Sequence, residues 1–200
     1  MKNMAILASG RGSNALELIK KAKELSQIRI KVLISDKADA GVLDHAKAHD
    51  IPHYVVQRKT LTQIEHEIEI IKILHNYKVS WIFLAGYMRI LSPQFIRRFH
   101  DNNYRNSRII NIHPSLLPAY KGLNAFERAY QDQINESGIT VHFVNEEVDG
   151  GQIIKQQRFK RYPEDTLSDF IQRGHKVEHT LYPQVLELLN NDTLSTQGHL

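Results

Sequence analysis

The chain has 200 residues, with 26 Lys or Arg and 22 Asp or Glu, which gives a formal net charge of +4. A hydrophobic fraction of 42% with 24% charged residues is typical of a folded globular protein, and a chain of this length can bury roughly 70% of its unfolded surface. The lack of cysteine in the sequence excludes a disulfide framework, a cysteine-ligated metal site and a thiol nucleophile.

The apolar segments of the sequence are too short to cross a membrane. None approaches the ~20 residues that span a bilayer, and the apolar start at 4–8 is too short for a signal peptide. We therefore expect no membrane partner and a cytoplasmic location. The basic residues form short, scattered clusters without interleaved aromatic side chains, so we also expect no nucleic-acid partner.

Strand-like and helix-like segments alternate along the first half of the chain. Short apolar runs that end at turn residues predict strands at 4–8, 28–35, 53–56, 79–85 and 108–112. Helical spacing, caps and prolines predict helices between them at 14–25, 41–49, 60–77 and 93–99. The clearest helix is 60–77, where the regularly spaced apolar residues are Leu61, Ile64, Ile68, Ile71 and Leu74.

The second half of the chain is less regular. Two prolines hold an irregular loop, because each disfavours helix at the residue before it. The last segment is helical in pattern but contains Gly174 and Pro183, so we expect a kink or break there. The expected elements are the loop 113–120, a helix at 123–133, an antiparallel pair of strands at 139–144 and 152–159, and the helical segment 165–189.

This alternation predicts an α/β fold: an open, mostly parallel doubly wound sheet with helices on both faces and an antiparallel strand pair late in the chain. We expect a single domain over 1–189, followed by a polar, frayed tail over 190–200. Ligands of such sheets bind beyond the carboxyl ends of the strands, so the residues that follow each strand are the candidates for a site.

A glycine-rich turn, Ser9-Gly10-Arg11-Gly12-Ser13-Asn14, follows the first predicted strand and opens the first helix. Glycines let the backbone approach a ligand closely, and free amides at a helix start attract an anion. Gly12, Ser13 and Asn14 are therefore predicted to bind a phosphate. A tight turn with a helix cap, and no ligand, is the simpler alternative.

The same turn also fits a dinucleotide-binding fingerprint. Gly10, Gly12 and Ala15 match G-x-G-x-x-G/A, and Asp36 follows Ala15 by 36 − 15 = 21 residues, where an acid would bind the ribose of a nicotinamide cofactor. A nicotinamide-dependent oxidoreductase is therefore an alternative function.

Two polar motifs later in the chain suit acyl transfer. Asn111 and His113 end a predicted strand at positions i and i+2, so both can face one cleft. An amide can donate to a developing oxyanion, and an imidazole can donate to it or move a proton. Asp149, before Gly150-Gly151, has a hairpin turn as its simpler interpretation. If Asp149 reaches His113, its charge is expected to raise the pKa of the imidazole.

Five blocks, taken in order, make the sequence similar to the folate-dependent formyltransferases over about residues 4–189. The blocks are 9–14, 85–92, 111–118, 140–144 and 149–151. The resemblance implies transfer of the formyl group of 10-formyltetrahydrofolate, a co-substrate, to the glycyl amine of 5-phosphoribosylglycinamide in de novo purine (IMP) biosynthesis, without a metal. A formyltetrahydrofolate hydrolase and a methionyl-tRNA formyltransferase share some of these motifs and are alternatives.

The resemblance also implies the residues of the site. The catalytic residues would be Asn111, His113 and Asp149. The ribosyl phosphate substrate would contact Gly12, Ser13, Asn14 and Glu178. The folate would contact Met88, Arg89, Ile90, Leu91, Asn111, Val144, Asn145, Glu146, Glu147 and Val148. The arginine that the family commonly has at the start of the third helix is missing here, which leaves Arg58 and Lys59 as candidates for the folate tail. The expected partners are small molecules, with the protein a monomer or homodimer.

Overall fold

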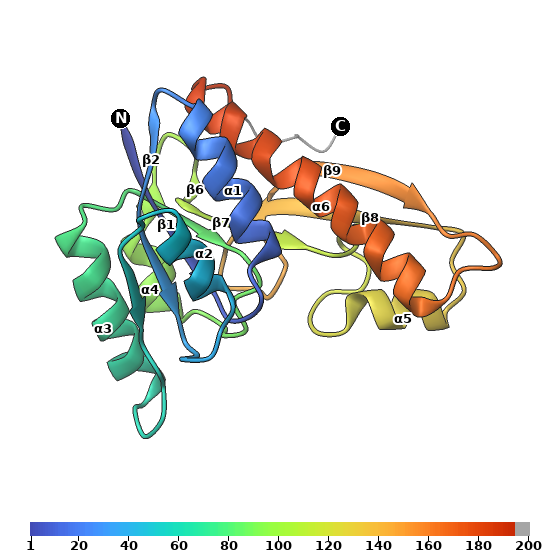
Figure 1. Ribbon diagram of the computed structural model, residues 1–200, viewed down its shortest axis with the longest axis horizontal. Helices are drawn as coiled ribbons and strands as arrows, with labels where there is room; N and C mark the ends of the chain where they lie inside the picture. Colours follow the sequence, from blue (N-terminus) through green and yellow to red (C-terminus); the bar gives the residue numbers. More distant parts are fainter. Residues whose placement is uncertain (195–200) are drawn as a thin grey trace.

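The computed structural model describes residues 1–194 and is built around a seven-stranded sheet (Figure 1). The strand order is β3-β2-β1-β4-β7-β8-β9; the first five strands are parallel, and β8 and β9 add antiparallel at one edge. The strands are β1 (Lys2–Ala8), β2 (Ile28–Ser35), β3 (His53–Val55), β4 (Trp81–Leu84), β7 (Ile109–His113), β8 (Glu136–Phe143) and β9 (Ile153–Lys160). The predicted fold class is confirmed, including the late antiparallel pair.

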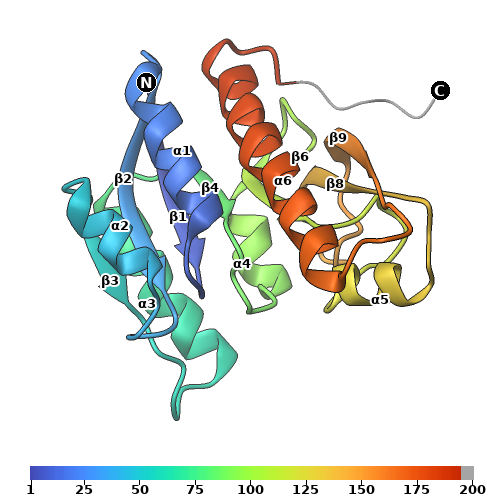
Figure 2. The same ribbon diagram turned by 45° about the vertical axis from the view of Figure 1, so that its right-hand side comes forward.

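Helices cover both faces of the sheet (Figures 1 and 2). One face packs on α1 (Ser13–Glu24), α2 (Val42–Ala48), α5 (Ala125–Gln131) and α6 (Leu167–Asn190), and the other on α3 (Gln63–Asn76) and α4 (Pro93–Arg98). Side chains alternate between these two cores along β1: Met4 and Ile6 belong to one, Ala5 and Leu7 to the other. Burial on both faces explains why this strand is a continuous apolar run in the sequence.

A two-stranded hairpin of β5 (His100–Asp101) and β6 (Asn106–Ser107) lies outside the main sheet and was not predicted. Strands of two residues are too short to leave a period-2 pattern in the sequence. The hairpin lengthens the connection between α4 and β7 without changing the order of the sheet.

The predicted helix at 60–77 is found as α3, but only part of its apolar stripe is buried. Leu74 is buried, whereas Ile64 and Ile68 are exposed and the buried face also carries His66 and Glu67. Nε2 of His66 lies 2.7 Å from a backbone carbonyl oxygen, and the Glu67 carboxylate accepts a backbone N–H from the segment after β4 at 2.7 Å. Hydrogen bonds to the backbone compensate the burial of these polar groups, which the spacing of apolar residues does not reveal.

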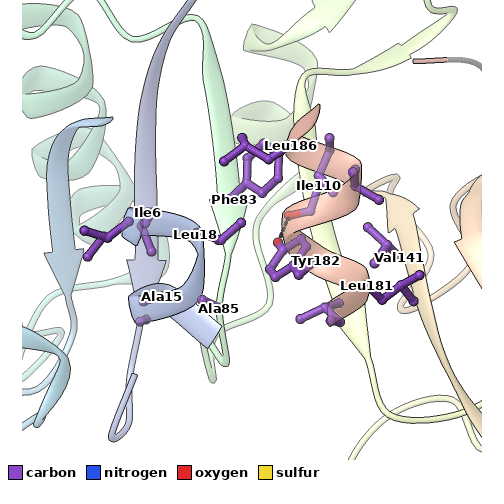
Figure 3. Packing of buried hydrophobic residues seen from close by; sticks show 14 of the residues in the cluster. Ile6, Ala15, Leu18, Phe83, Ala85, Ile110, Val141, Leu181, Tyr182 and Leu186 are labelled. Carbon is purple, nitrogen blue, oxygen red and sulfur yellow. Dashed lines mark hydrogen bonds between the residues drawn. The ribbon is translucent and has the colours of Figure 1, made fainter. Parts of the chain in front are cut away.

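The break expected at Gly174 and Pro183 is not found, because α6 runs continuously from Leu167 to Asn190. Tyr182 is fully buried, and its hydroxyl lies 2.9 Å from the carbonyl oxygen of Leu84 and 3.1 Å from that of Ile110 (Figure 3). This residue fixes the helix to β4 and β7. Tertiary packing therefore holds the helix together through the proline that removes one of its hydrogen bonds.

The chain stays packed just beyond α6. Asn190 is the last residue of the helix, and the side chain of Leu194 is buried against the core. Residues 195–200 of the predicted tail lie outside the described residues. Among the residues that the structure describes, no helix is both long and apolar enough to cross a bilayer.

Gly174→Ala should destabilise the fold, although alanine favours helix. An added Cβ would lie 2.3 Å from Cε1 of Phe126, whose ring packs against Phe159, Phe170 and His175 and has little room to move. We expect the free energy of unfolding to fall by about 1–3 kcal/mol, measured by urea denaturation. Gln172→Ala, on the exposed face of the same helix, is the control and should change stability by less than about 0.5 kcal/mol.

Candidate active site

The antiparallel strands β7 and β8 place four polar side chains on one face. Asn111 pairs with His142, and His113 with Thr140, so the i and i+2 residues of both strands point the same way. β4 ends where Leu84 pairs with Asn111, and β1 ends where Leu7 pairs with Leu84. The segments that follow β1, β4 and β7 therefore begin side by side.

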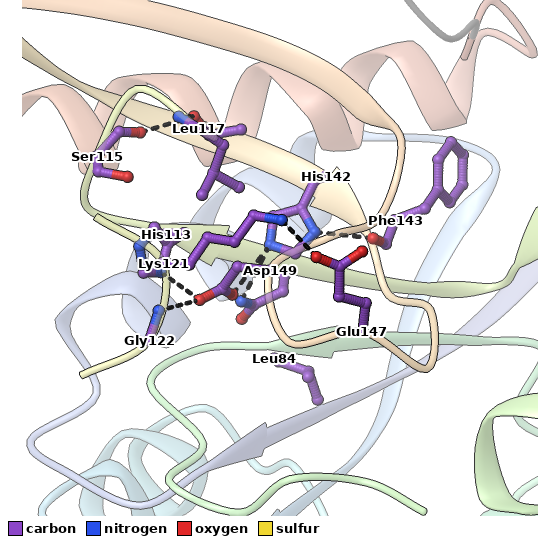
Figure 4. Close-up of polar contacts among 12 residues, drawn as sticks. Leu84, His113, Ser115, Leu117, Lys121, Gly122, His142, Phe143, Glu147 and Asp149 are labelled. Atoms are coloured by element: carbon purple, nitrogen blue, oxygen red, sulfur yellow. Dashed lines mark hydrogen bonds and ion pairs between the residues drawn. The ribbon is translucent and has the colours of Figure 1, made fainter. Parts of the chain in front are cut away.

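Asp149 reaches His113 from a loop far along the chain (Figure 4). Nδ1 of His113 lies 3.2 Å from Oδ2 of Asp149, and the same oxygen accepts the backbone N–H of Gly122 at 2.8 Å. Nε2 of His113 lies 2.9 Å from the carbonyl oxygen of Tyr120. The imidazole and the late carboxylate thus face each other, and both are buried.

The sequence led us to expect a raised pKa for His113, but the pKa is not raised. Burial lowers it below its ordinary value, although the charge of Asp149 and the carbonyl of Tyr120 act in the opposite direction. Both ring nitrogens nevertheless face oxygen acceptors, which suits an imidazolium with two protons. The ring can therefore take up a second proton as soon as negative charge develops beside it.

Asp149 is held in its charged form. Burial alone would raise the pKa of this carboxyl, but hydrogen bonds from His142 and from the Gly122 N–H, with the electrostatic effect of the neighbouring imidazoles, bring it below its usual value. The residue therefore supplies a fixed negative charge next to the imidazole.

His142 joins the other three residues, and the sequence analysis gave it no role. Its Nε2 lies 3.3 Å from Nδ2 of Asn111 and 3.5 Å from Oδ1 of Asp149, and its Nδ1 lies 2.8 Å from the carbonyl oxygen of Phe143. It is 2% exposed. The available signal was the alternation of Thr140 and His142 on a predicted strand, but the pairing of that strand with β7 had to be known before it could be used.

Thr140 fixes the loop that follows β7. Its hydroxyl donates to the carbonyl of Ser115 at 2.6 Å and accepts the backbone N–H of Leu117 at 3.1 Å. Gln156 of β9 donates to the same hydroxyl at 2.8 Å and to the Leu117 carbonyl at 3.0 Å. The loop 113–120 is therefore clamped to both antiparallel strands, which holds Tyr120 against His113.

Steric contact explains why the Asp-Gly-Gly turn ends in glycine. A Cβ at Gly151 would lie 1.7 Å from the carbonyl oxygen of Phe143, so only glycine fits there. Asp149 itself has a φ of 51°, in the left-handed region that Asp and Asn tolerate better than most residues. This close approach turns the β8–β9 connection back over the face that carries His113 and His142.

The glycine loop opens α1 as predicted. Gly12 precedes the helix with a φ of 83°, and a Cβ there would lie 2.4 Å from Cγ2 of Val42. In the part of the chain that the structure describes, no side chain caps the first turn, and Asn14 Oδ1 is buried without a partner. The uncapped backbone N–H groups at this helix start fit an anion such as a phosphate, whereas Asn14 Oδ1 can only accept a hydrogen bond.

Glu178 faces this loop from α6. Its carboxylate accepts a hydrogen bond from Nδ2 of Asn14 at 2.9 Å. Burial raises the pKa of Glu178 to about 7, against the opposing effect of Asn14. The predicted substrate residues thus form one group, which consists of Gly12, Ser13, Asn14 and Glu178. The loop of this group follows β1, and β4 separates β1 from β7, which carries Asn111.

This raised pKa predicts a pH-dependent stability. A carboxyl whose folded pKa lies above the unfolded value of 4.5 stabilises the protein fully below about pH 4.5, and this stabilisation is lost as the pH rises through about 7. We expect wild type to lose on the order of 3 kcal/mol relative to Glu178→Gln between pH 4.5 and 8, measured by urea denaturation. A stability difference that does not change with pH would contradict the assignment.

The predicted folate segment Met88–Leu91 lies beside a cavity of about 280 Å³. Apolar side chains on it are unusually exposed: Met88 is 59% and Ile90 is 70% exposed. Two guanidinium groups, of Arg58 and Arg89, line the cavity together with Gln63. An apolar edge next to cationic groups fits a flat, aromatic ligand that carries carboxylates.

The second predicted folate segment, 144–148, carries two acids that pair with neighbouring elements. Oε1 of Glu146 lies 2.6 Å from Nη1 of Arg97. Oε1 of Glu147 lies 2.7 Å from Nζ of Lys121, a pair that Figure 4 shows. Val148 at the end of the segment is exposed. These side chains position the loop, so ligand contacts from Glu146 and Glu147 would have to come from their backbone.

Comparison with known proteins gives the family. The sequence model described as Formyl transferase matches residues 2–186. The chain belongs to the formyl transferase family. Phosphoribosylglycinamide formyltransferase of Haemophilus influenzae is 42% identical over an alignment of 203 positions, which covers 100% of this chain and 92% of that protein.

Two further formyl transferase relatives agree with this. Trifunctional purine biosynthetic protein adenosine-3 of Homo sapiens is 38% identical over 193 residues; the match covers 96% of this chain and 18% of that longer protein. The crystal structure of phosphoribosylglycinamide formyltransferase from Anaplasma phagocytophilum has a TM-score of 0.87 and 38% identity, covering 98% of this chain and 93% of that one.

In this formyl transferase the dinucleotide alternative has no support. Asp36, where an acid would bind a cofactor ribose, is instead buried in an ion pair with Arg89 at 2.7 Å. The glycine loop packs on the start of α2, where the backbone N–H of Val42 donates to the carbonyl of Gly10 at 3.1 Å. Across residues 1–194, no group of three His, Asp or Glu side chains is arranged to hold a metal ion.

Proposed function

We propose that this protein transfers the formyl group of 10-formyltetrahydrofolate to the glycyl amine of 5-phosphoribosylglycinamide, a step of de novo purine biosynthesis. The observation that carries the proposal is the contact between His113 and Asp149 beside Asn111. The uncapped helix start follows β1 and the apolar, cationic edge follows β4, and both strands lie to one side of β7, which carries Asn111 and His113. The names of the relatives support the choice of substrates.

The acceptor needs positioning more than a strong base. An α-amino group has a pKa near 8, so roughly a tenth of it is neutral at pH 7 and can attack the formyl carbon. The helix start at Gly12–Asn14 would hold its phosphate, and Glu178 would accept hydrogen bonds from its ribosyl hydroxyls. These contacts orient the amine toward Asn111 and His113.

Asn111 and His113 would stabilise the oxyanion that forms on the formyl oxygen when the amine attacks the formyl carbon. Nδ2 of Asn111 has two hydrogens and one neighbour at His142, which leaves a donor for the substrate oxygen. Nε2 of His113 lies 2.9 Å from the carbonyl of Tyr120, and the formyl oxygen would approach the same ring nitrogen. The attacking amine loses one proton and the leaving folate nitrogen gains one, and His113 or a water ordered by Asp149 would carry the proton between them.

The folate would lie along Met88–Leu91 and the loop 144–148. Met88, Ile90 and Val148 offer apolar contacts for its rings. Of the two candidates for the tail, Arg58 lines the cavity with Arg89. We assign the carboxylates of the tail to these two guanidinium groups.

An assay with and without the acceptor tests the function. Purified protein is mixed with 10-formyltetrahydrofolate, and the release of the folate product is followed by absorbance. Release that depends on phosphoribosylglycinamide supports transfer. Release without the acceptor would overturn the proposal in favour of a formyltetrahydrofolate hydrolase, and release that depends on methionyl-tRNA would favour a tRNA formyltransferase.

The proposal also covers the cellular location of the enzyme and its oligomeric state. We place the reaction in the cytoplasm, as the biosynthetic role of the relatives suggests, and cell fractionation would check this. All proposed site residues come from one chain, which fits a monomer or a homodimer.

A further inference from the structure

Asp36 has an unusual position for a residue that the proposed reaction does not use. It follows β2, and its side chain is 1% exposed. Oδ2 accepts a hydrogen bond from Nε of Arg89 at 2.7 Å, while Oδ1 has no partner among the residues that the structure describes. A buried carboxylate with a single cationic partner depends strongly on that partner.

The pair spans the end of β1. Asp36 follows β2 and Arg89 follows β4, and β1 lies between these strands in the sheet. Ser9, at the end of β1, donates its N–H to the Gly86 carbonyl at 3.1 Å and accepts the Met88 N–H at 2.9 Å. These bonds fix the backbone after β4, and Asp36 adds a contact that fixes the arginine side chain.

The contact through Nε determines what Arg89 can offer. A guanidinium has five N–H donors in a planar fork, and engaging Nε leaves those on the two terminal nitrogens for a ligand. The Arg89 side chain is 40% exposed and lines the cavity with Arg58. A long side chain that is already ordered loses less conformational entropy when a carboxylate binds.

We propose that Asp36 is a positioning residue for the formyl donor: it holds Arg89 so that the terminal nitrogens of the guanidinium face the carboxylate-bearing part of the folate. The inference rests on the proposed function. It gives a role to the acid that the sequence had suggested for a cofactor ribose.

Calorimetric titration with 10-formyltetrahydrofolate tests this together with kinetics. Asp36→Ala should weaken folate binding about tenfold and raise its KM to match, with kcat and the KM for the acceptor within twofold of wild type. Asp36→Asn, whose side-chain oxygen can still accept from Nε, should restore most of the affinity. The effect of Asp36→Ala should vanish with the carboxamide of 10-formyltetrahydropteroate, which lacks the glutamate and carries no carboxylate.

A double-mutant cycle separates positioning from a merely structural role. In an Arg89→Ala background, Asp36→Ala should cause no further loss of folate affinity. Asp165→Ala is the matched control, because Asp165 is equally buried and pairs with Arg173 at 2.5 Å on another part of the fold. It should lower the melting temperature without changing folate affinity.

Three results would overturn the inference: equal folate affinity in Asp36→Ala and wild type, an undiminished loss in the Arg89→Ala background, or the same loss with the pteroate carboxamide. If Asp36→Ala does not fold, Asp36→Asn replaces it in the double-mutant cycle. We then expect Asp36→Asn to weaken folate binding about threefold in wild type and to have no effect in the Arg89→Ala background. A wild-type protein that binds folate but does not transfer formyl would refute the proposed reaction and leave this binding test intact.

Discussion

His113→Ala should lower kcat by about 10²–10⁴, because the imidazole is the one group placed to donate to the oxyanion and to move a proton. This corresponds to roughly 3–5 kcal/mol of transition-state stabilisation. Substrate binding should change little, since the phosphate and folate contacts come from other elements. Steady-state kinetics with both substrates, and calorimetry with each, would separate the two effects.

The control for this variant is a histidine that also contacts a backbone carbonyl but lies away from the candidate site. His53 lies on β3, at the edge of the sheet, and its Nδ1 is 3.0 Å from the Ile51 carbonyl oxygen. His53→Ala should keep kcat within twofold of wild type. Turnover of His113→Ala within threefold of wild type, in a folded protein, would remove the imidazole from the mechanism.

The sheet could be predicted because its signal is local. Parallel strands buried on both faces leave continuous apolar runs, and β2 begins and ends where the pattern places it. The face of α3 could not be predicted in the same way, since His66 and Glu67 are buried through partners that are distant in the chain. Hydrophobic spacing cannot show hydrogen bonds of that kind.

The candidate site also combines features that could be predicted from the sequence with features that could not. Asn111 and His113 share a face by simple alternation, which the sequence gives directly. His142 joins them only through the register of β7 and β8, and Asp149 reaches them only because Gly151 lets the loop turn back. The sign of the His113 pKa shift was also beyond the sequence, because it depends on how deeply the ring is buried.

Asp149→Asn should also lower kcat by about 10²–10⁴, for a different reason. The substitution keeps the size of the side chain but removes the fixed negative charge at 3.2 Å from Nδ1 of His113. The Gly122 N–H and Nδ1 of His113 both contact Oδ2 of Asp149, and an amide oxygen in that position can still accept from both, so the substitution chiefly removes the charge. The imidazolium that forms in the transition state then has no counter-charge.

Loss of charge must be separated from loss of a loop anchor, because Asp149 also holds Gly122. Asp132 provides the matched control: its Oδ2 accepts a hydrogen bond from the hydroxyl of Tyr120, in the same loop, at 2.9 Å, but it does not contact His113. Asp132→Asn should keep kcat within about threefold of wild type. If both variants lost turnover equally, the role of Asp149 would be to anchor the loop. A large loss in Asp149→Asn alone is what a charge acting on the imidazole requires.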